Sequence, residues 1–121
     1  MFKGFGTQET FTPIPNSFFQ QLLKEVDDVQ ELKVTLHALW CVENMEGPLR
    51  VLREDDFTSV VAEPAEAPEK AVARGSLLRV EHGSGRIYFV NSPRGRQAAE
   101  ALKAGKLEAE ILETSSPPVE R

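Results

Sequence analysis

Cysteine and long apolar runs are nearly absent from this sequence of 121 residues. Cys41 is the single cysteine, which excludes an intrachain disulfide framework and fits a reducing compartment. No run approaches the roughly 20 apolar residues that a membrane helix needs, and no basic region followed by an apolar stretch opens the chain. We therefore expect a soluble, cytoplasmic protein in which Cys41 is a small core residue.

Recognisable catalytic groups are also lacking. An enzyme would need a nucleophile beside a base, a carboxylate pair in split environments or a metal cluster. The two histidines, His37 and His82, fall in a predicted helix and a predicted turn, with no reason to meet. The adjacent acids 54–56 have no second ligand group, and Gly83-Ser84-Gly85 lacks the lysine and the context of a phosphate loop. We expect no enzymatic activity, no cofactor and no metal.

Charge is unevenly distributed along the chain. The net charge of −5 argues against a generally basic nucleic-acid binder. Residues 1–69 carry 5 basic and 13 acidic side chains, residues 70–106 carry 8 and 2, and residues 107–121 carry 1 and 4. The positive middle segment is either a binding surface or a chance cluster on a solvated face.

The first half of the chain predicts an arm and two helices. Residues 1–15 combine glycine and proline with phenylalanine, which is typical of an extended arm with aromatic anchors. Asn16 is a suitable N-cap for a helix over residues 16–26. Asp28 and Glu31 match the sense of a capping box at the start of a second helix, which is apolar around much of its circumference and ends at Gly47-Pro48.

The second half predicts short elements and a hairpin, followed by an acidic tail or linker over residues 105–121 that contains serine and proline. Each predicted helix of this half begins with residues that favour a first turn: the acids 54–56 in the first, Pro68 in the second and Ser92-Pro93 in the last. The predicted order is a strand over 49–52, a helical turn after 54–56, a helix over 68–74 ended by Gly75, strands over 77–80 and 87–90 joined by a turn at 81–85, and a final helix from Ser92-Pro93.

This order predicts an α+β fold of the winged-helix (winged helix-turn-helix) type over residues 16–104. The N-terminal arm over residues 1–15 precedes the domain, which begins with an extra helix and has one helix after the wing. An isolated hairpin is marginal in water, so the apolar side chains of its strands need the helices to bury them.

Several local patterns resemble one family over about residues 11–100. They are Thr12-Pro13-Ile14-Pro15-Asn16-Ser17-Phe18-Phe19, Asp27-Asp28 with Glu31-Leu32-Lys33-Val34-Thr35-Leu36, Ala71-Val72-Ala73-Arg74-Gly75-Ser76-Leu77-Leu78, and Tyr88-Phe89-Val90-Asn91-Ser92-Pro93-Arg94-Gly95. Together they resemble the N-terminal region of DnaD-like replication-initiation proteins of bacteria. The resemblance implies a winged-helix domain that self-associates and supports primosome assembly. The DNA-binding helical domain of longer members has no counterpart here, so its DNA binding is not carried over.

Two surfaces are candidates for binding. The first is a basic edge on the third winged-helix helix, the wing and the segment just beyond, where guanidinium and ammonium groups could neutralise phosphates. Such binding to DNA would be weak, salt-sensitive and largely non-specific, because the helix is short and introduced by prolines. The residues of this basic edge are Lys70, Arg74, Arg79, Arg86, Arg94 and Arg96.

The second candidate is a self-association surface in and after the arm, formed by Phe2, Phe5, Phe11, Ile14 and Phe18. These side chains could pack across a two-fold axis in a homo-oligomer, with a dimer expected first, or they could cover the second helix of the same chain. Replication-initiation proteins are the expected partners, and no membrane is expected. The alternative function is a winged-helix transcription regulator that contacts duplex DNA through helix 68–74 and the wing.

Overall fold

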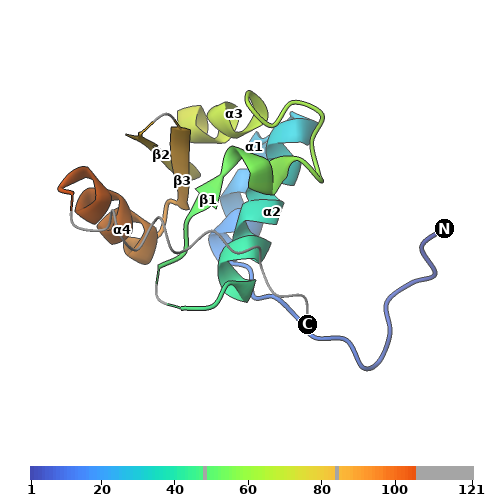
Figure 1. Ribbon diagram of the computed structural model, residues 1–121. Coiled ribbons are helices and arrows are strands. Elements are labelled where there is room, and N and C mark those ends of the chain that lie inside the picture. The colour runs from blue at the N-terminus through green and yellow to red at the C-terminus, as the bar shows by residue number, and fades with distance from the viewer. Residues whose placement is uncertain (48, 84, 106–121) are drawn as a thin grey trace.

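The computed structural model describes residues 1–47, 49–83 and 85–105. They form an α+β fold with four α-helices and a three-stranded antiparallel sheet that contains a β-hairpin (Figure 1). The elements are η1 (Phe18–Leu22), α1 (Leu23–Glu25), α2 (Val29–Asn44), β1 (Leu52–Arg53), η2 (Glu54–Phe57), α3 (Ala67–Arg74), β2 (Leu77–His82), β3 (Gly85–Val90) and α4 (Pro93–Lys103). This arrangement is compatible with a winged helix. The predicted tail at 105–121 lies outside the described residues from position 106 onward.

The first predicted helix is present but is not a regular α-helix. Helical backbone runs over residues 16–25, with a π-helical segment, η1, in its middle. Asn16 lies inside the first helical turn, so its predicted role as N-cap is wrong. The Phe18 N–H donates to the Pro15 carbonyl at 3.0 Å, which attaches the arm to the start of this helix.

The central helix, α2, begins where the sequence predicts. The Asp28 carboxylate caps it by accepting hydrogen bonds from the N–H groups of Gln30 (2.8 Å) and Glu31 (3.2 Å). The Glu31 side chain does not complete a capping box; it pairs with Arg74 of α3 instead. Because α2 is apolar on more than one side, it contributes Val34 and Cys41 among its buried residues.

The sheet has the order β1-β3-β2. Strands β2 and β3 pair from Leu77 with Val90 to His82 with Gly85, so the hairpin strands are longer and the turn shorter than expected. Gly83 has a φ of +60°, which suits a hairpin turn. The first strand is shorter than the predicted 49–52 and pairs with β3 through Leu52 opposite Tyr88.

Both faces of the sheet are covered by helices. Alternate side chains of the strands enter two separate apolar clusters, as the two-residue period of a strand requires. Leu77 and Tyr88 pack with residues of α2 and α3, whereas Val80, Ile87 and Phe89 pack with residues of α4. Figure 1 shows α4 on the opposite side of the hairpin from α2. The final helix is therefore a structural layer of the domain.

The junction between β3 and α4 is tight. The Ser92 side chain caps α4 by accepting the Gly95 N–H at 3.1 Å, as its Ser-Pro sequence predicts. A Cβ atom added to Gly95 would lie 1.8 Å from the Val90 carbonyl oxygen. Residue 95 must therefore be glycine for α4 to start this close to the strand.

The third helix, α3, ends at Gly75, whose φ of +99° is the left-handed cap conformation. Its first turn contains Pro68, as expected. Across the described ranges, no helix is both long enough and apolar enough to cross a membrane.

Candidate interaction surfaces

The basic edge predicted from the sequence is divided by the structure. Lys70 and Arg74 lie on α3 and pair with the first residues of α2, at Asp28 and Glu31. Arg94, on α4, instead lines a cavity with Val42 and Glu43 near the end of α2. At 1.5 Å per residue, these two regions of α2 are roughly 17 Å apart along the helix axis. The six residues are therefore spread along the length of α2 instead of being gathered at one point.

Two ion pairs join α3 to the start of α2. The Arg74 guanidinium binds both carboxylate oxygens of Glu31, through Nε and through an NH2 contact of 3.2 Å. Glu31 is only 3% exposed, so this carboxylate depends on its arginine partner. Lys70 donates to Asp28, and this hydrogen bond lowers the pKa of Asp28 and raises the pKa of Lys70. Both cations of α3 therefore have acidic partners within the chain.

The two arginines of the β2–β3 hairpin, Arg79 and Arg86, meet at Glu69, in the first turn of α3. One Glu69 oxygen binds Arg79, while the other accepts the Tyr88 hydroxyl at 2.6 Å and lies 3.6 Å from Arg86. Burial, followed by the hydrogen bond to Glu69, raises the pKa of Tyr88 to about 12. Arg86 also donates to the Ala65 carbonyl at 3.2 Å. Glu69 is thus the common partner of the two hairpin arginines.

Four of the six candidate phosphate-binding residues are therefore held in ion pairs inside the domain. A fifth, Arg96, donates to the Asn91 side chain at 3.0 Å. A protein gains affinity for DNA by releasing counterions when its lysine and arginine side chains neutralise phosphates, and side chains already paired with carboxylates are less available for this. The acidic partners Asp28, Glu31 and Glu69 were not expected from the sequence, although each lies at the first turn of a helix, where carboxylates are favoured.

The arm carries most of the exposed aromatic surface. Phe2, Phe5 and Phe11 are 70%, 87% and 91% exposed, and the rings of Phe2 and Phe5 pack edge to face at 5.0 Å. They do not cover α2 of the same chain, and Figure 1 shows the arm extending away from the helices. Ile14 is half-buried. Phe18 is only 3% exposed and belongs to the interior. The prediction that it forms part of a self-association surface is therefore wrong.

Apolar side chains are also exposed on the body of the domain. They lie on two neighbouring helical segments, η1–α1 and α2. The exposed members are Phe19, Leu23, Val29 and Leu36, with exposed fractions of 49%, 45%, 61% and 36%.

The residues considered as candidates for catalysis or metal binding have structural roles in the domain. Cys41 is buried, and burial raises the pKa of its thiol to about 12, so the thiolate is disfavoured. The His37 ring lies 2.8 Å from the Asp56 carbonyl oxygen and stacks on Trp40. The Asp56 carboxylate accepts the Arg53 N–H at 2.7 Å. Within the described residues, no three His, Cys, Asp or Glu side chains are grouped as a metal site requires.

The chain was compared with protein-family models, curated proteins and solved structures. None of the three comparisons gives a match. The role of the chain is accordingly inferred from its own residues.

Proposed function

We propose that this chain is a non-enzymatic winged-helix module that self-associates through its N-terminal arm. In keeping with the resemblance to DnaD-like proteins, its role is to support partner assembly in bacterial DNA replication initiation. The observation that carries the self-association is the exposure of Phe2, Phe5 and Phe11. The link to replication rests on the sequence resemblance.

The winged-helix assignment is supported by the order of elements and by the sheet. The helix α2, the strand β1, the short helices η2 and α3, and the hairpin β2–β3 follow one another as in that fold. The first strand pairs with the last one, β3, so the hairpin is connected to the helical part by backbone hydrogen bonds. In this fold α3 takes the place of the recognition helix.

The size of the aromatic surface supports an interface between copies. An aromatic side chain buries 150–250 Å², so three rings would supply roughly 450–750 Å². A standard interface buries about 800 Å² on each partner. The arm therefore supplies a large share of one side, and each buried phenylalanine contributes about 1.5–3 kcal/mol. The exposed Phe19 and Leu23 add apolar surface on the body of the domain.

DNA contact is secondary in this proposal. The alternative, a transcription regulator that reads duplex DNA through α3 and the wing, needs cations there that can reach phosphates. Lys70, Arg74, Arg79 and Arg86 are already paired with carboxylates of the same chain. Binding at this surface would be weak and non-specific.

Sedimentation velocity over a range of concentrations tests the proposal. We expect the wild type to form a dimer at tens of micromolar and the double variant Phe5→Ala, Phe11→Ala to be monomeric. A matched control changes two exposed polar residues of the same arm, Thr7→Ala and Gln8→Ala, and should dimerise like the wild type. A monomeric wild type at these concentrations, or a phenylalanine variant that dimerises normally, would refute self-association through the arm.

A further inference from the structure

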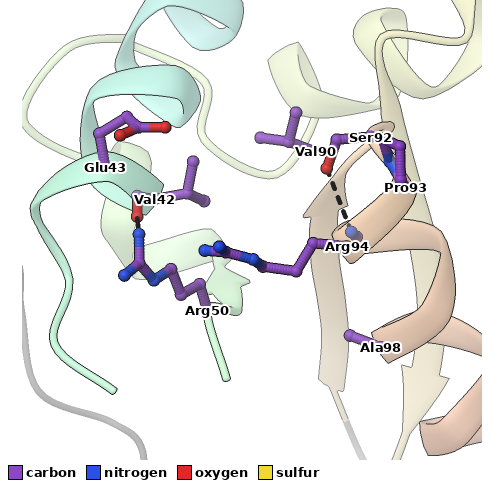
Figure 2. Close-up of a pocket in the computed structure, with 9 residues that line it drawn as sticks. Val42, Glu43, Arg50, Val90, Ser92, Pro93, Arg94 and Ala98 are labelled. Atoms are coloured by element: carbon purple, nitrogen blue, oxygen red, sulfur yellow. Dashed lines mark hydrogen bonds between the residues drawn. The ribbon is translucent and has the colours of Figure 1, made fainter. Parts of the chain in front are cut away.

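A cavity of about 570 Å³ lies where the end of α2 faces the start of α4. The segment that carries Arg50 and the end of β3 also line this cavity, in addition to the two helices (Figure 2). Its walls combine the apolar side chains of Val42, Val90 and Ala98 with two arginines, Arg50 and Arg94. None of these residues belongs to the exposed arm.

The two guanidinium groups converge in this cavity. Arg50 is positioned by one carbonyl group in the last turn of α2 and one just after it: its NH1 donates to Val42 at 2.6 Å and its Nε donates to Gly47 at 3.1 Å. Figure 2 shows the Arg94 side chain extending from α4 across the cavity toward the Arg50 guanidinium. The fold therefore brings together two positive charges that are distant in the sequence.

Neither of these charges is neutralised by an acidic side chain in the described part of the chain. Arg50 and Arg94 form no ion pair there, in contrast to Lys70, Arg74 and Arg79. Glu43 also lines the cavity, but Figure 2 shows its carboxylate turned away from the space between the guanidinium groups. Two like charges brought together repel one another, and an anion between them would convert this repulsion into attraction.

The start of α4 adds a hydrogen-bond donor and partial positive charge beside the two guanidinium groups. Ser92 already accepts the Gly95 N–H, and Pro93 has no N–H to offer. The Arg94 N–H is in the first turn and therefore has no carbonyl partner within its own helix. A helix start also carries partial positive charge, which favours an anion there.

We propose that this cavity binds a phosphate ester. Its phosphate lies between the guanidinium groups of Arg50 and Arg94, and its organic part lies against Val42, Val90 and Ala98. Arginine suits this task because its planar group binds phosphate oxygens in a bidentate manner. The site is separate from self-association through the arm. A free nucleotide and the backbone of a nucleic-acid strand both present this chemistry.

Nuclear magnetic resonance of the ¹⁵N-labelled chain tests the proposal with three probes: inorganic phosphate, adenosine monophosphate and a short single-stranded oligodeoxynucleotide. We expect saturable shifts of the Arg94 and Gly95 amides and of the Arg50 Nε–H. The variant Arg94→Gln should weaken binding about tenfold or more, because it removes a charge-assisted hydrogen bond. Lys103→Gln is the control at the other end of the same helix; it also loses one positive charge from an exposed position outside the cavity and should change affinity less than about twofold.

Arg94 is exposed and decides the test, because Arg50 also satisfies carbonyls at the end of α2 and its loss would disturb that helix. Tighter binding of the oligonucleotide than of the mononucleotide assigns the phosphate to a nucleic-acid strand. Equal or tighter binding of the mononucleotide assigns it to a small ligand. The proposal is overturned if no probe gives saturable shifts at these three groups, or if Arg94→Gln binds as well as Lys103→Gln. The same titration of the Phe5→Ala, Phe11→Ala variant should be unchanged, which separates this site from the proposed dimer.

Discussion

The substitution Gly95→Ala is expected to destabilise the domain, although the same change in most helices is stabilising. By helix propensity alone, alanine gains up to about 1 kcal/mol over glycine. At Gly95, however, the new Cβ would lie 1.8 Å from the Val90 carbonyl oxygen and 3.0 Å from its carbon. Real Cβ atoms essentially never come within 3.0 Å of such neighbours, so α4 and β3 would have to move apart by more than 1 Å. The two Val90 atoms belong to the backbone and cannot rotate out of the way as a flexible side chain could.

The cost of this movement exceeds the gain. Overpacking a well-packed site costs about 1–3 kcal/mol, and shifting the start of α4 also disturbs the Ser92 cap, which is worth about 1 kcal/mol. Ala99 and Leu102 of α4, both 4% exposed, would lose packing against the sheet as well. We expect a net loss of roughly 2 kcal/mol in the free energy of unfolding, with a fall in Tm on the order of 10 °C.

Urea unfolding followed by the fluorescence of Trp40, the only tryptophan, measures this change. Gln97→Ala, at an exposed position of the same helix, is the control and should stay within about 0.5 kcal/mol of the wild type. A Gly95→Ala variant as stable as the wild type would refute the close approach of α4 to β3.

Three further predictions concern buried or paired groups. Glu69→Gln removes the carboxylate that Arg79 and Arg86 share, and leaves Arg79 only the more distant Glu81, 3.7 Å away. Duplex DNA should therefore bind more tightly at low salt in fluorescence anisotropy, and unchanged binding would contradict the ion-pair assignment. The folded state raises the pKa of Tyr88 to about 12 from its usual 10, so it favours the neutral phenol. Its contribution to stability is complete below pH 10 and is lost between pH 10 and 12; a Tyr88→Phe variant should lack this part of the decline in urea midpoint. Cys41, whose pKa is raised to about 12 by burial, should react with a thiol reagent only after unfolding, and rapid labelling of the native chain would show that it is accessible.

Signals that act within a few residues could be predicted from the sequence. Asp28 and Ser92 cap their helices as expected, and Gly75 ends α3 in the left-handed conformation that glycine permits. The hairpin was also correct, because two runs of β-forming residues flank a glycine-containing turn. Such features depend on neighbouring residues in the chain and need no knowledge of the tertiary structure.

Long-range pairing could not be predicted in the same way. Glu31 and Arg74 are 43 positions apart, and only the packing of α3 on α2 brings them together. The capping-box pattern at Asp28 correctly located the start of α2 but assigned Glu31 to the wrong partner. The π-helical segment that begins at Phe18 was also not predicted, because such a turn leaves no clear trace in the sequence.

The position of α4 on the outer face of the hairpin has a consequence for synthesis on the ribosome. The chain is made from its N-terminus, so α2, α3 and the hairpin are complete before the last helix exists. Until then the apolar side chains of Val80, Ile87 and Phe89 lack the cover that α4 provides, although the opposite face of the sheet can already pack. A nascent chain whose hairpin has left the ribosome while α4 is still inside it would expose this apolar strand surface, and release of α4 would complete the fold and cover it.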